Sequence, residues 1–267
     1  MTAVTTSSRS GPRAAISDLG RLPGVDGLVR KELREWRRGR RAWIVLLVST
    51  VFMVLAALNS WLQANLPAEA GVVPADAIVD PLMNLVGSVS GQIFVVAAIF
   101  AVMSLVVGER ESGTLAWTAS KPVSRRAIWL SKFGVSVVVL WIAAGLIPLA
   151  ATAALVVVLY GAVPVLPVLA IGIGMGLAIA LYIAVALAVS TVVPSQAAVA
   201  GIALAAMFLP QVLGIVMPAE FLPTSILQWS ILTGVGESAG IVTPIAWAIA
   251  VGALVAFALY RMERLEF

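Results

Sequence analysis

Six long apolar runs alternate with more polar segments after residue 41. The runs cover residues 42–62, 83–107, 133–159, 167–193, 197–217 and 241–260. Crossing a hydrocarbon core of ~30 Å takes about 20 helical residues, and each run is long enough. The pattern therefore predicts an all-α integral membrane protein with six transmembrane helices. An even number of spans places both termini on the same side of the membrane.

The residues before the first run follow a different pattern. Residues 1–24 are rich in Ser, Thr, Gly, Pro and Arg and show no apolar period, which predicts a flexible tail. Residues 25–41 place basic side chains on one helical face and apolar side chains on the other. The apolar positions are Val25, Leu28, Val29, Leu33 and Trp36. We expect an amphipathic helix at the membrane interface, with a basic flank of the first span as the alternative. The transmembrane domain then covers residues 25–267.

The segment between the last two runs, residues 218–240, is mostly apolar but interrupted. Pro218 and Pro223 break it, and three glycines follow near its end. It is too short to form two further spans. We expect a re-entrant or interfacial helical hairpin on the outer face, because irregular backbone at membrane depth must be buried in protein or line a water-filled cavity.

The basic residues indicate the orientation of the spans. All 17 lysines and arginines fall before Ala42, between the second and third runs, or after Tyr260. With six spans, these three places share one face of the membrane. The segments 63–82 and 218–240, on the other face, hold only acidic charges. Because basic residues concentrate on the cytoplasmic side, both termini and residues 108–132 are predicted to be cytoplasmic.

Composition supports a membrane protein and argues against several kinds of chemistry. The chain has 267 residues, of which 61% are hydrophobic and 11% charged, and it has no cysteine and no histidine. Soluble domains carry about 25% charged residues. No ionisable residue lies near the centre of a run, which argues against a proton-driven pump. Lys31, Lys121 and Lys132 do not lie in a GxxxxGKS or GxxxxGKT phosphate-binding loop. We therefore predict no catalytic site, no metal site and no cofactor in this chain.

Uncharged polar residues are the candidates for lining a substrate path. They are Asn59, Asn84, Gln92, Gln196 and Gln211. The low charge of the apolar runs favours an apolar, amphipathic or lipid-like substrate. The net charge of +4 does not indicate nucleic-acid binding, and no nucleic-acid partner is predicted.

Glycines occur at spacings that suit close helix packing in two of the runs. Gly87 and Gly91 form a GxxxG pattern in the second run, and Gly172, Gly174 and Gly176 cluster in the fourth. Small residues allow helices to approach closely in membranes. Glycine is also common in membrane helices without such a role, so both interpretations stay open.

Residues 108–132 form a charged segment between the second and third runs. It carries the charges Glu109, Arg110, Glu111, Lys121, Arg125, Arg126 and Lys132. Gly113 and Thr114 allow a turn, and Pro122 disfavours helix at the preceding residue. Ser124 lies at an N-cap position for a helix that leads into the third run. We expect a helix, a break and an amphipathic helix just below the membrane, with an ordinary positive-inside loop as the alternative.

These residues resemble the cytoplasmic loop of ABC-2 type transporter permeases. The matching stretches are Glu109-Arg110-Glu111-Ser112-Gly113-Thr114-Leu115, Lys121-Pro122-Val123-Ser124-Arg125, and then Lys132. Members of that family show E-x-E-x-G-T-L, then P-V-S-R, then a lysine at the start of the next span. The likeness is strongest to the branch that contains the NosY and NatB-like permeases. Six spans, a basic amphipathic helix before the first and an outer hairpin before the last extend it over most of the chain.

The resemblance implies a membrane subunit that is driven by a separate ATPase. In the family the loop carries a coupling helix that sits in a groove of the ATPase, and the helix before the first span is the elbow helix. The resemblance assigns the ATPase contact to Glu109, Glu111, Gly113, Thr114, Leu115, Pro122, Ser124 and Arg125. Two permeases pair with two ATPase subunits, which bind the ATP and Mg²⁺, and the second permease is another copy or a sister chain. The location implied is the bacterial cytoplasmic (inner) membrane, in contact with its lipids.

These observations favour the permease subunit of an ATP-binding cassette transporter, working as an exporter. The alternative is a membrane scaffold or assembly factor that transports nothing. A membrane-embedded enzyme acting on lipids is a second rival, but it needs buried acids, bases or metal ligands that the runs lack. Loss of ATPase stimulation on changing the charged segment would distinguish the transporter from the scaffold.

Overall fold

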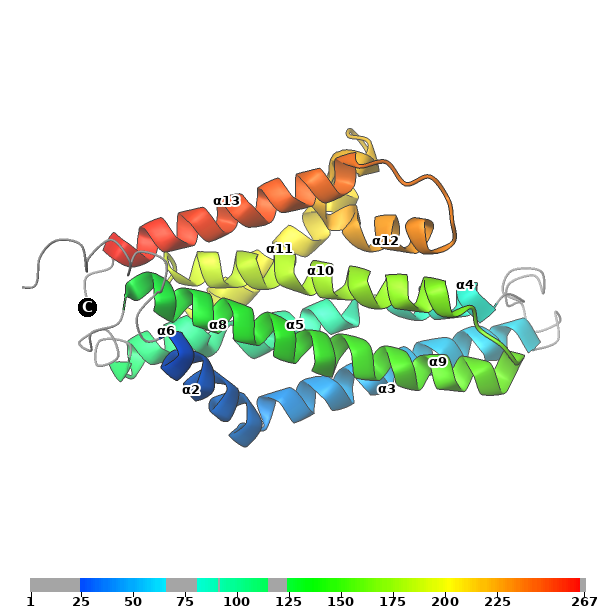
Figure 1. The fold of residues 1–267 in the computed structure, drawn as a ribbon, viewed down its shortest axis with the longest axis horizontal. Helices are drawn as coiled ribbons and strands as arrows, with labels where there is room; N and C mark the ends of the chain where they lie inside the picture. The colour runs from blue at the N-terminus through cyan, green and yellow to red at the C-terminus, as the bar shows by residue number, and fades with distance from the viewer. Residues whose placement is uncertain (1–24, 66–80, 91, 115–123, 265–267) are drawn as a thin grey trace, which may run out of the picture.

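The computed structural model describes residues 25–65, 81–90, 92–114 and 124–264, and all regular structure within them is helical. The chain forms an elongated bundle (Figure 1). Its elements are α2 (Val25–Arg38), α3 (Arg41–Asn65), α4 (Pro81–Ser90), α5 (Ile93–Val102), α6 (Ser104–Glu111), α8 (Arg125–Leu140), the π-helix η3 (Trp141–Leu146), α9 (Ile147–Tyr160), α10 (Val165–Ser190), α11 (Gln196–Leu213), the 3-10 helices η4 (Ala219–Phe221) and η5 (Pro223–Ser225), α12 (Ile226–Gly234) and α13 (Val242–Arg264). The prediction of an all-α protein is confirmed for the described residues.

Within the described residues, five helical stretches are long and apolar enough to cross a membrane, so the chain is a multi-pass membrane protein. They are Arg41–Gln63, Pro81–Glu111, Arg125–Tyr160, Val165–Ser190 and Val242–Arg264. The remaining predicted span, residues 197–217, corresponds to α11, which contains Pro210 and ends at Leu213 before a series of turns. Its apolar part, Gln196–Pro210, is shorter than the others. A count of six spans therefore stays a prediction.

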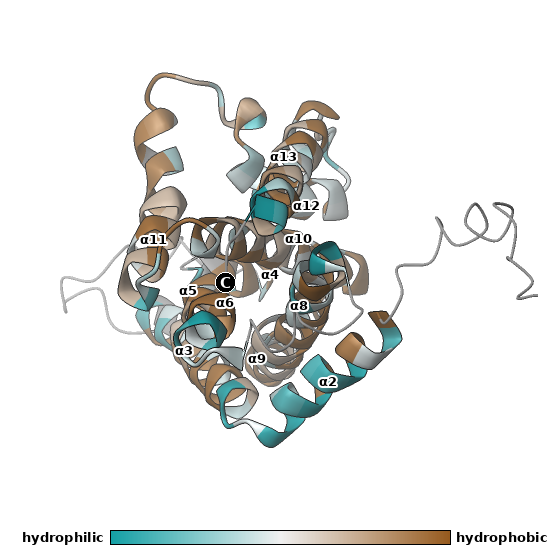
Figure 2. Cartoon of the chain, turned by 90° about the vertical axis from the view of Figure 1, so that its left-hand side faces the viewer, coloured by the Kyte–Doolittle hydropathy of each residue, from teal (hydrophilic) through white to brown (hydrophobic). Residues whose placement is uncertain are grey.

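The helix α10 lies at the centre of the bundle, as the view along the bundle shows (Figure 2). It packs against α5, α8, α11, α12 and α13. Apolar side chains cover all its sides, which is typical of a helix enclosed by others. The helices α3 and α13 lie at the periphery and expose apolar side chains such as Trp43 and Ile249. These exposed faces suit contact with lipid or with another membrane subunit.

The ends of the described chain lie together at one end of the bundle, which we call the inner end. Figure 1 shows α2, α6, the start of α8 and the last turn of α13 there. Arg126 near the start of α8 pairs with Glu263 near the end of α13. This arrangement agrees with an even number of membrane crossings. Which side of the membrane the inner end faces stays a prediction.

The third predicted span is one helical stretch with a π-helix in its middle. Pro148 follows the π-helix at the start of α9 and has no N–H to donate, which favours irregular pairing just before it. The π-helix directs Trp141 at α10, where its Nε1 donates to the carbonyl of Gly172 at 2.7 Å. A Cβ on Gly176 would lie 2.7 Å from the same nitrogen. The close-approach interpretation of the glycines is thus confirmed for α10, whereas Gly87 of α4 faces open space.

The second predicted span, residues 83–107, is interrupted rather than continuous. The helix α4 ends at Ser90 and α5 begins at Ile93. Between them Gln92 has a φ of 51°, and no other non-glycine residue in the described part of the chain has a positive φ. A side chain in this left-handed conformation costs of order 1–3 kcal/mol, and such strain often marks a functional site. The small and polar residues Gly87, Ser88, Ser90, Gly91 and Gln92 inside the apolar run were the available signal of this break.

The segment after α11 forms η4, η5 and α12, and Figure 1 shows the chain returning from the far end of α12 to the start of α13. The helix α12 lies against α10 through small residues. A Cβ on Gly174 would lie 2.6 Å from the Cβ of Ser230, and one on Gly234 would lie 2.5 Å from the Cβ of Ala170. The expected broken helical structure is present, and its depth in a membrane stays a prediction.

Candidate functional site

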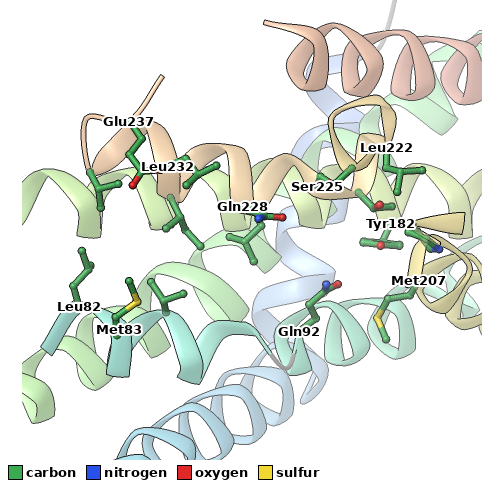
Figure 3. A pocket seen from close by; sticks show the side chains of 18 of the residues that line it. Leu82, Met83, Gln92, Tyr182, Met207, Leu222, Ser225, Gln228, Leu232 and Glu237 are labelled. Atoms are coloured by element: carbon green, nitrogen blue, oxygen red, sulfur yellow. The ribbon is translucent and has the colours of Figure 1, made fainter. Parts of the chain in front are cut away.

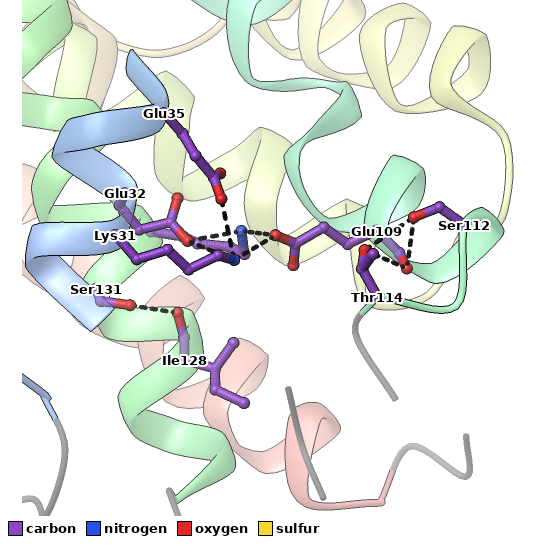
Figure 4. A network of polar contacts seen from close by, with 9 residues as sticks. Lys31, Glu32, Glu35, Glu109, Ser112, Thr114, Ile128 and Ser131 are labelled. Carbon is purple, nitrogen blue, oxygen red and sulfur yellow. Dashed lines mark hydrogen bonds and ion pairs between the residues drawn. The ribbon is translucent and has the colours of Figure 1, made fainter. Parts of the chain in front are cut away.

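Five charged side chains meet at the inner end of the bundle, where α2, α6 and α8 converge (Figure 4). We call this group the ion cluster. It consists of Lys31, Glu32 and Glu35 from α2, Glu109 from α6 and Lys132 from α8. The helices α6 and α8 are the two sides of the charged segment 108–132, so the cluster lies at the base of the predicted coupling loop.

Lys132 is the centre of the ion cluster. Its Nζ lies 3.0 Å from Glu32 Oε1 and 2.8 Å from Glu109 Oε1. The side chains of Lys132 and Glu32 are only 1% and 2% exposed. Two charges are removed from water here, so each depends on its partner, and loss of one partner from a buried pair typically costs 3–5 kcal/mol. The contact therefore holds α2, α6 and α8 in one fixed arrangement.

Lys31 closes the cluster from its more exposed side. Its Nζ lies 3.1 Å from Glu109 Oε1, 3.4 Å from Glu35 Oε1 and 3.7 Å from Glu32 Oε1. Partial burial lowers the pKa of Lys31, but the carboxylates of Glu109, Glu32 and Glu35 outweigh it and raise the pKa above its usual 10.5. Lys31 therefore stays positively charged at neutral pH.

The three carboxylates of the cluster also lie close enough to one another to suggest a metal site. One oxygen each from Glu32, Glu35 and Glu109 lies within 4.8 Å of the others. The ammonium group of Lys31 lies within 3.7 Å of an oxygen of each of them. It occupies the position that a metal ion would take, so the chemistry of this site is that of a structural ion pair network.

The amphipathic helix is present as predicted, but its buried face differs from the expected one. The helix α2 ends at Arg38 and α3 begins at Arg41, so the predicted range 25–41 is divided between them. The buried positions of α2 are Leu28, Glu32 and Trp36, while Leu33 is 39% exposed. Glu32 was missed because a carboxylate in an apolar stripe has no obvious partner in the local sequence. Its spacing of four from both Leu28 and Trp36 was the available signal.

The end of α6 is connected to the inner ends of two further helices. Arg110 donates from Nη2 to the carbonyl of Val193 at 2.9 Å and to that of Ser190 at 3.4 Å. Ser190 is the last residue of α10 and Val193 lies just beyond it. The C-terminal end of a helix has unpaired acceptors and favours a cation. Gln196 at the start of α11 donates to Glu111 at 3.0 Å. The segment that carries Glu109, Arg110 and Glu111 is thus tied to α2, α8, α10 and α11.

The turn predicted at Gly113 and Thr114 is confirmed. Gly113 has a φ of +72°, the left-handed conformation that glycine adopts at helix C-termini. Thr114 Oγ1 donates to the carbonyl of Glu109 at 3.3 Å and lies 2.8 Å from Ser112 Oγ. These bonds close the end of α6. Of the other residues of the family motif, Leu115 and Pro122 lie outside the described residues.

The predicted N-cap of the helix leading into the third span is also confirmed. Ser124 Oγ accepts a hydrogen bond from the backbone N–H of Ala127 at 3.1 Å, and α8 begins at Arg125. Arg125 donates to the carbonyl of Glu263 at 3.2 Å, and Arg126 forms an ion pair with the carboxylate of Glu263. The start of α8 is thereby tied to the end of α13.

All described charges of the segment 108–132 therefore contact the protein's own helices. The family resemblance assigns Glu109, Glu111 and Arg125 to a contact with the ATPase, and that contact stays a prediction. In the structure they position the two ends of the loop.

The candidates for lining a substrate path fall in different environments. Asn84 is buried, and its Nδ2 donates to the carbonyl of Ala57 at 3.1 Å and to Tyr160 Oη at 2.9 Å. Asn59 is exposed on α3, and Gln196 binds Glu111 at the inner end. Gln92, just before α5, lines a cavity between α4, α10, α11 and α12. Gln211 lies in α11. The structure thus does not bring the five together.

A protein family model matches most of the chain. The model of a family described as ABC-2 family transporter protein matches residues 27–250. The chain therefore belongs to the ABC-2 transporter family. A search of curated proteins finds no match. The chain is a permease subunit of an ABC transporter, and the family implies a partner ATPase. The predicted family is confirmed, and the NosY and NatB-like branch stays a prediction.

Proposed function

We propose that the segment 108–132 receives force from the partner ATPase and that the ion cluster passes this force to the bundle. The observation that carries the proposal is the position of Glu109, whose Oε1 contacts Lys31 of α2 and Lys132 of α8 at once. A push on the loop would then move α2, α6 and α8 as one body. Buried pairs suit this role because their partners separate only at a high cost in free energy.

The remaining contacts of the segment would distribute the movement to the rest of the bundle. Arg110 holds the end of α10 and Glu111 the start of α11. Arg125 and Arg126 hold the end of α13. We propose that closure of the ATPase subunits shifts these helices together and changes access to a path for the substrate.

We further propose the assembly and orientation that the family resemblance implies. Two permease chains would pair through exposed apolar helix faces, with two ATPase subunits below them holding the ATP and Mg²⁺. Six membrane crossings, with α11 as the fifth, would place both termini and residues 108–132 in the cytoplasm of a bacterial cell. The concentration of lysine and arginine at the inner end supports this orientation. The transport direction proposed is outward.

The experiment starts from membranes of the native host that contain the affinity-tagged full-length chain. An ATPase should co-purify, and its ATP hydrolysis in lipid nanodiscs should fall several-fold in Glu111→Ala and Gly113→Trp, since one removes the contact with α11 and the other places a large side chain at a left-handed turn. The matched control is Glu220→Ala, which removes an exposed carboxylate from η4, outside the charged segment 108–132. Undiminished hydrolysis in both loop variants would contradict the proposed contact, and the absence of a co-purifying ATPase would favour the scaffold.

Because the chain has no cysteine, orientation can be measured with single introduced cysteines. A membrane-impermeant maleimide applied to intact cells should label Glu237→Cys and leave Ser112→Cys unlabelled until the cells are opened. The reverse result would overturn the assignment of the inner end to the cytoplasm.

A further inference from the structure

A cavity of about 760 Å³ opens between α4, the break before α5, α10, α11 and α12 (Figure 3), and none of the five residues of the ion cluster is among its lining residues. Volumes of this size are typical of sites for small molecules, which span roughly 300–1,000 Å³. Three of its boundaries are irregular: the break between α4 and α5, the turns after α11, and the segment that leads into α12. Three irregular stretches of backbone thus border one space.

One end of the cavity carries uncharged hydrogen-bonding groups. Tyr182 of α10 is 2% exposed, and its hydroxyl has no hydrogen-bond partner among the described residues. Gln92 and Gln228 line the same end from the α4–α5 break and from α12 (Figure 3). A buried hydroxyl without a partner is unfavourable, and native proteins rarely leave one in that state. Tyr182 is therefore available to a ligand.

The other end of the cavity is apolar except for Glu237, which lies beside Leu232 (Figure 3). Leu82 and Met83 of α4 lie there opposite Leu232 of α12 (Figure 3). Among the described residues that line the cavity, Glu237 is the only one that carries a charge at neutral pH, and it lies beyond the end of α12. That described lining includes no lysine or arginine that could pair with an anionic head group.

We propose that this cavity binds an uncharged amphiphile. A hydroxyl or amide group of the ligand would bond to Tyr182, Gln92 and Gln228, while its hydrocarbon part would lie between α4 and α12. The left-handed backbone of Gln92 is then explained as the cost of placing an amide at the polar end. The inference names the substrate class of the proposed transporter and so rests on that function, but occupancy of the cavity can be measured without the ATPase.

The test uses the purified full-length chain in nanodiscs and three photoactivatable probes with the same hydrocarbon chain. One is a monoacylglycerol, one a fatty acid and one an alkylamine, each with a diazirine on the chain. The monoacylglycerol should label peptides from α4 and α12, and the fatty acid should label them much less. Tyr182→Phe should weaken saturable labelling by the monoacylglycerol about fivefold, which is the loss expected for one hydrogen bond. Preferred labelling by the alkylamine would assign the site to cations at Glu237 and overturn the proposal.

Two further variants show whether a loss of labelling comes from the cavity or from misfolding. Tyr260→Phe removes the same hydroxyl from an exposed position on α13 and should leave labelling unchanged. Leu232→Trp fills the apolar end and should abolish saturable labelling while the protein still elutes as a single species. Equal labelling by all three probes, or no response to Tyr182→Phe and Leu232→Trp, would refute the site. Saturable labelling without any ATPase coupling would instead refute the proposed function and leave the site standing.

Discussion

Two regions of this bundle, the ion cluster and the cavity, have opposite chemistry. At the inner end, charged side chains are packed so closely that Lys132 and Glu32 are almost completely buried. Around the cavity, uncharged polar groups surround open space and Tyr182 lacks a partner. Satisfied ion pairs suit a part that must move without deforming, whereas an unsatisfied hydroxyl and broken helices suit a part that must accommodate another molecule. We call the ion cluster with α2, α6 and α8 the rigid region, and the cavity with the helices around it the receptive region.

The two regions are connected through α8 and α10 on one side and through α5 and α6 on the other. Trp129 of α8, which begins at the loop, donates to the carbonyl of Leu187 in α10 at 3.4 Å. Tyr182 lies five residues earlier in the same helix, a rise of about 7.5 Å. On the other side, α6 of the ion cluster follows directly from α5, which starts at the break beside Gln92. Movement of the loop can therefore reach the cavity through α5 and α10.

The largest expected effect tests the rigid region. Lys132→Met removes the nearest partner of the buried Glu32 carboxylate and leaves it, among the described residues, only the ammonium group of Lys31 at 3.7 Å. The free energy of unfolding should therefore fall by about 3–5 kcal/mol. Denaturant titration of the purified chain in detergent, followed by tryptophan fluorescence, measures this.

The double variant Glu32→Met/Lys132→Met serves as the control, because replacing both charges with apolar groups is often neutral. It should recover most of the lost stability but not the coupling to the ATPase. If Lys132→Met alone is as stable as the unaltered chain, the ion cluster does not hold the three helices together.

The next prediction concerns the close contact between α12 and α10 at the edge of the receptive region. A Cβ on Gly234 would lie 2.5 Å from the Cβ of Ala170 and 3.0 Å from the Cα of Pro167, so Gly234→Ala should push α12 away from α10. We expect a loss of about 1–3 kcal/mol, as for other overpacked sites, together with weaker labelling of the cavity.

Gly87→Ala is the matched control, since a Cβ there would meet open space. In a helix this change should be neutral or stabilise the protein by about 0.5–1 kcal/mol. Equal thermal stability of the Gly234 and Gly87 variants would show that α12 does not depend on its close approach to α10.

The smallest expected effect concerns Gln92, where stability and ligand binding should change in opposite directions. Gln92→Gly relieves a left-handed conformation, so the free energy of unfolding should rise by about 0.5–1 kcal/mol. Labelling by the uncharged probe should fall, because an amide is lost from the polar end. Gln228→Ala should lower labelling without the gain in stability. A Gln92→Gly protein that is less stable and labels normally would show that the break serves packing rather than a ligand.

Much of the architecture followed from local patterns. The apolar runs located the membrane helices to within a few residues, apart from the shortened α11 and the divided second run. The N-cap at Ser124 and the turn at Gly113 were also predicted correctly, since both depend on the conformational preferences of one or two residues. The family followed from the motif around the same loop.

The sequence by itself thus determined the helices, their approximate ends and the charged loop between two of them, because spacing and capping act over a few residues. Only the tertiary structure decided that Glu32 pairs with Lys132, 100 positions away, that Trp141 packs against the glycines of α10, and that Tyr182 faces a cavity. These contacts depend on how helices rotate and pack against one another. Apolar helices in a membrane protein carry little periodicity to show which side will face which neighbour.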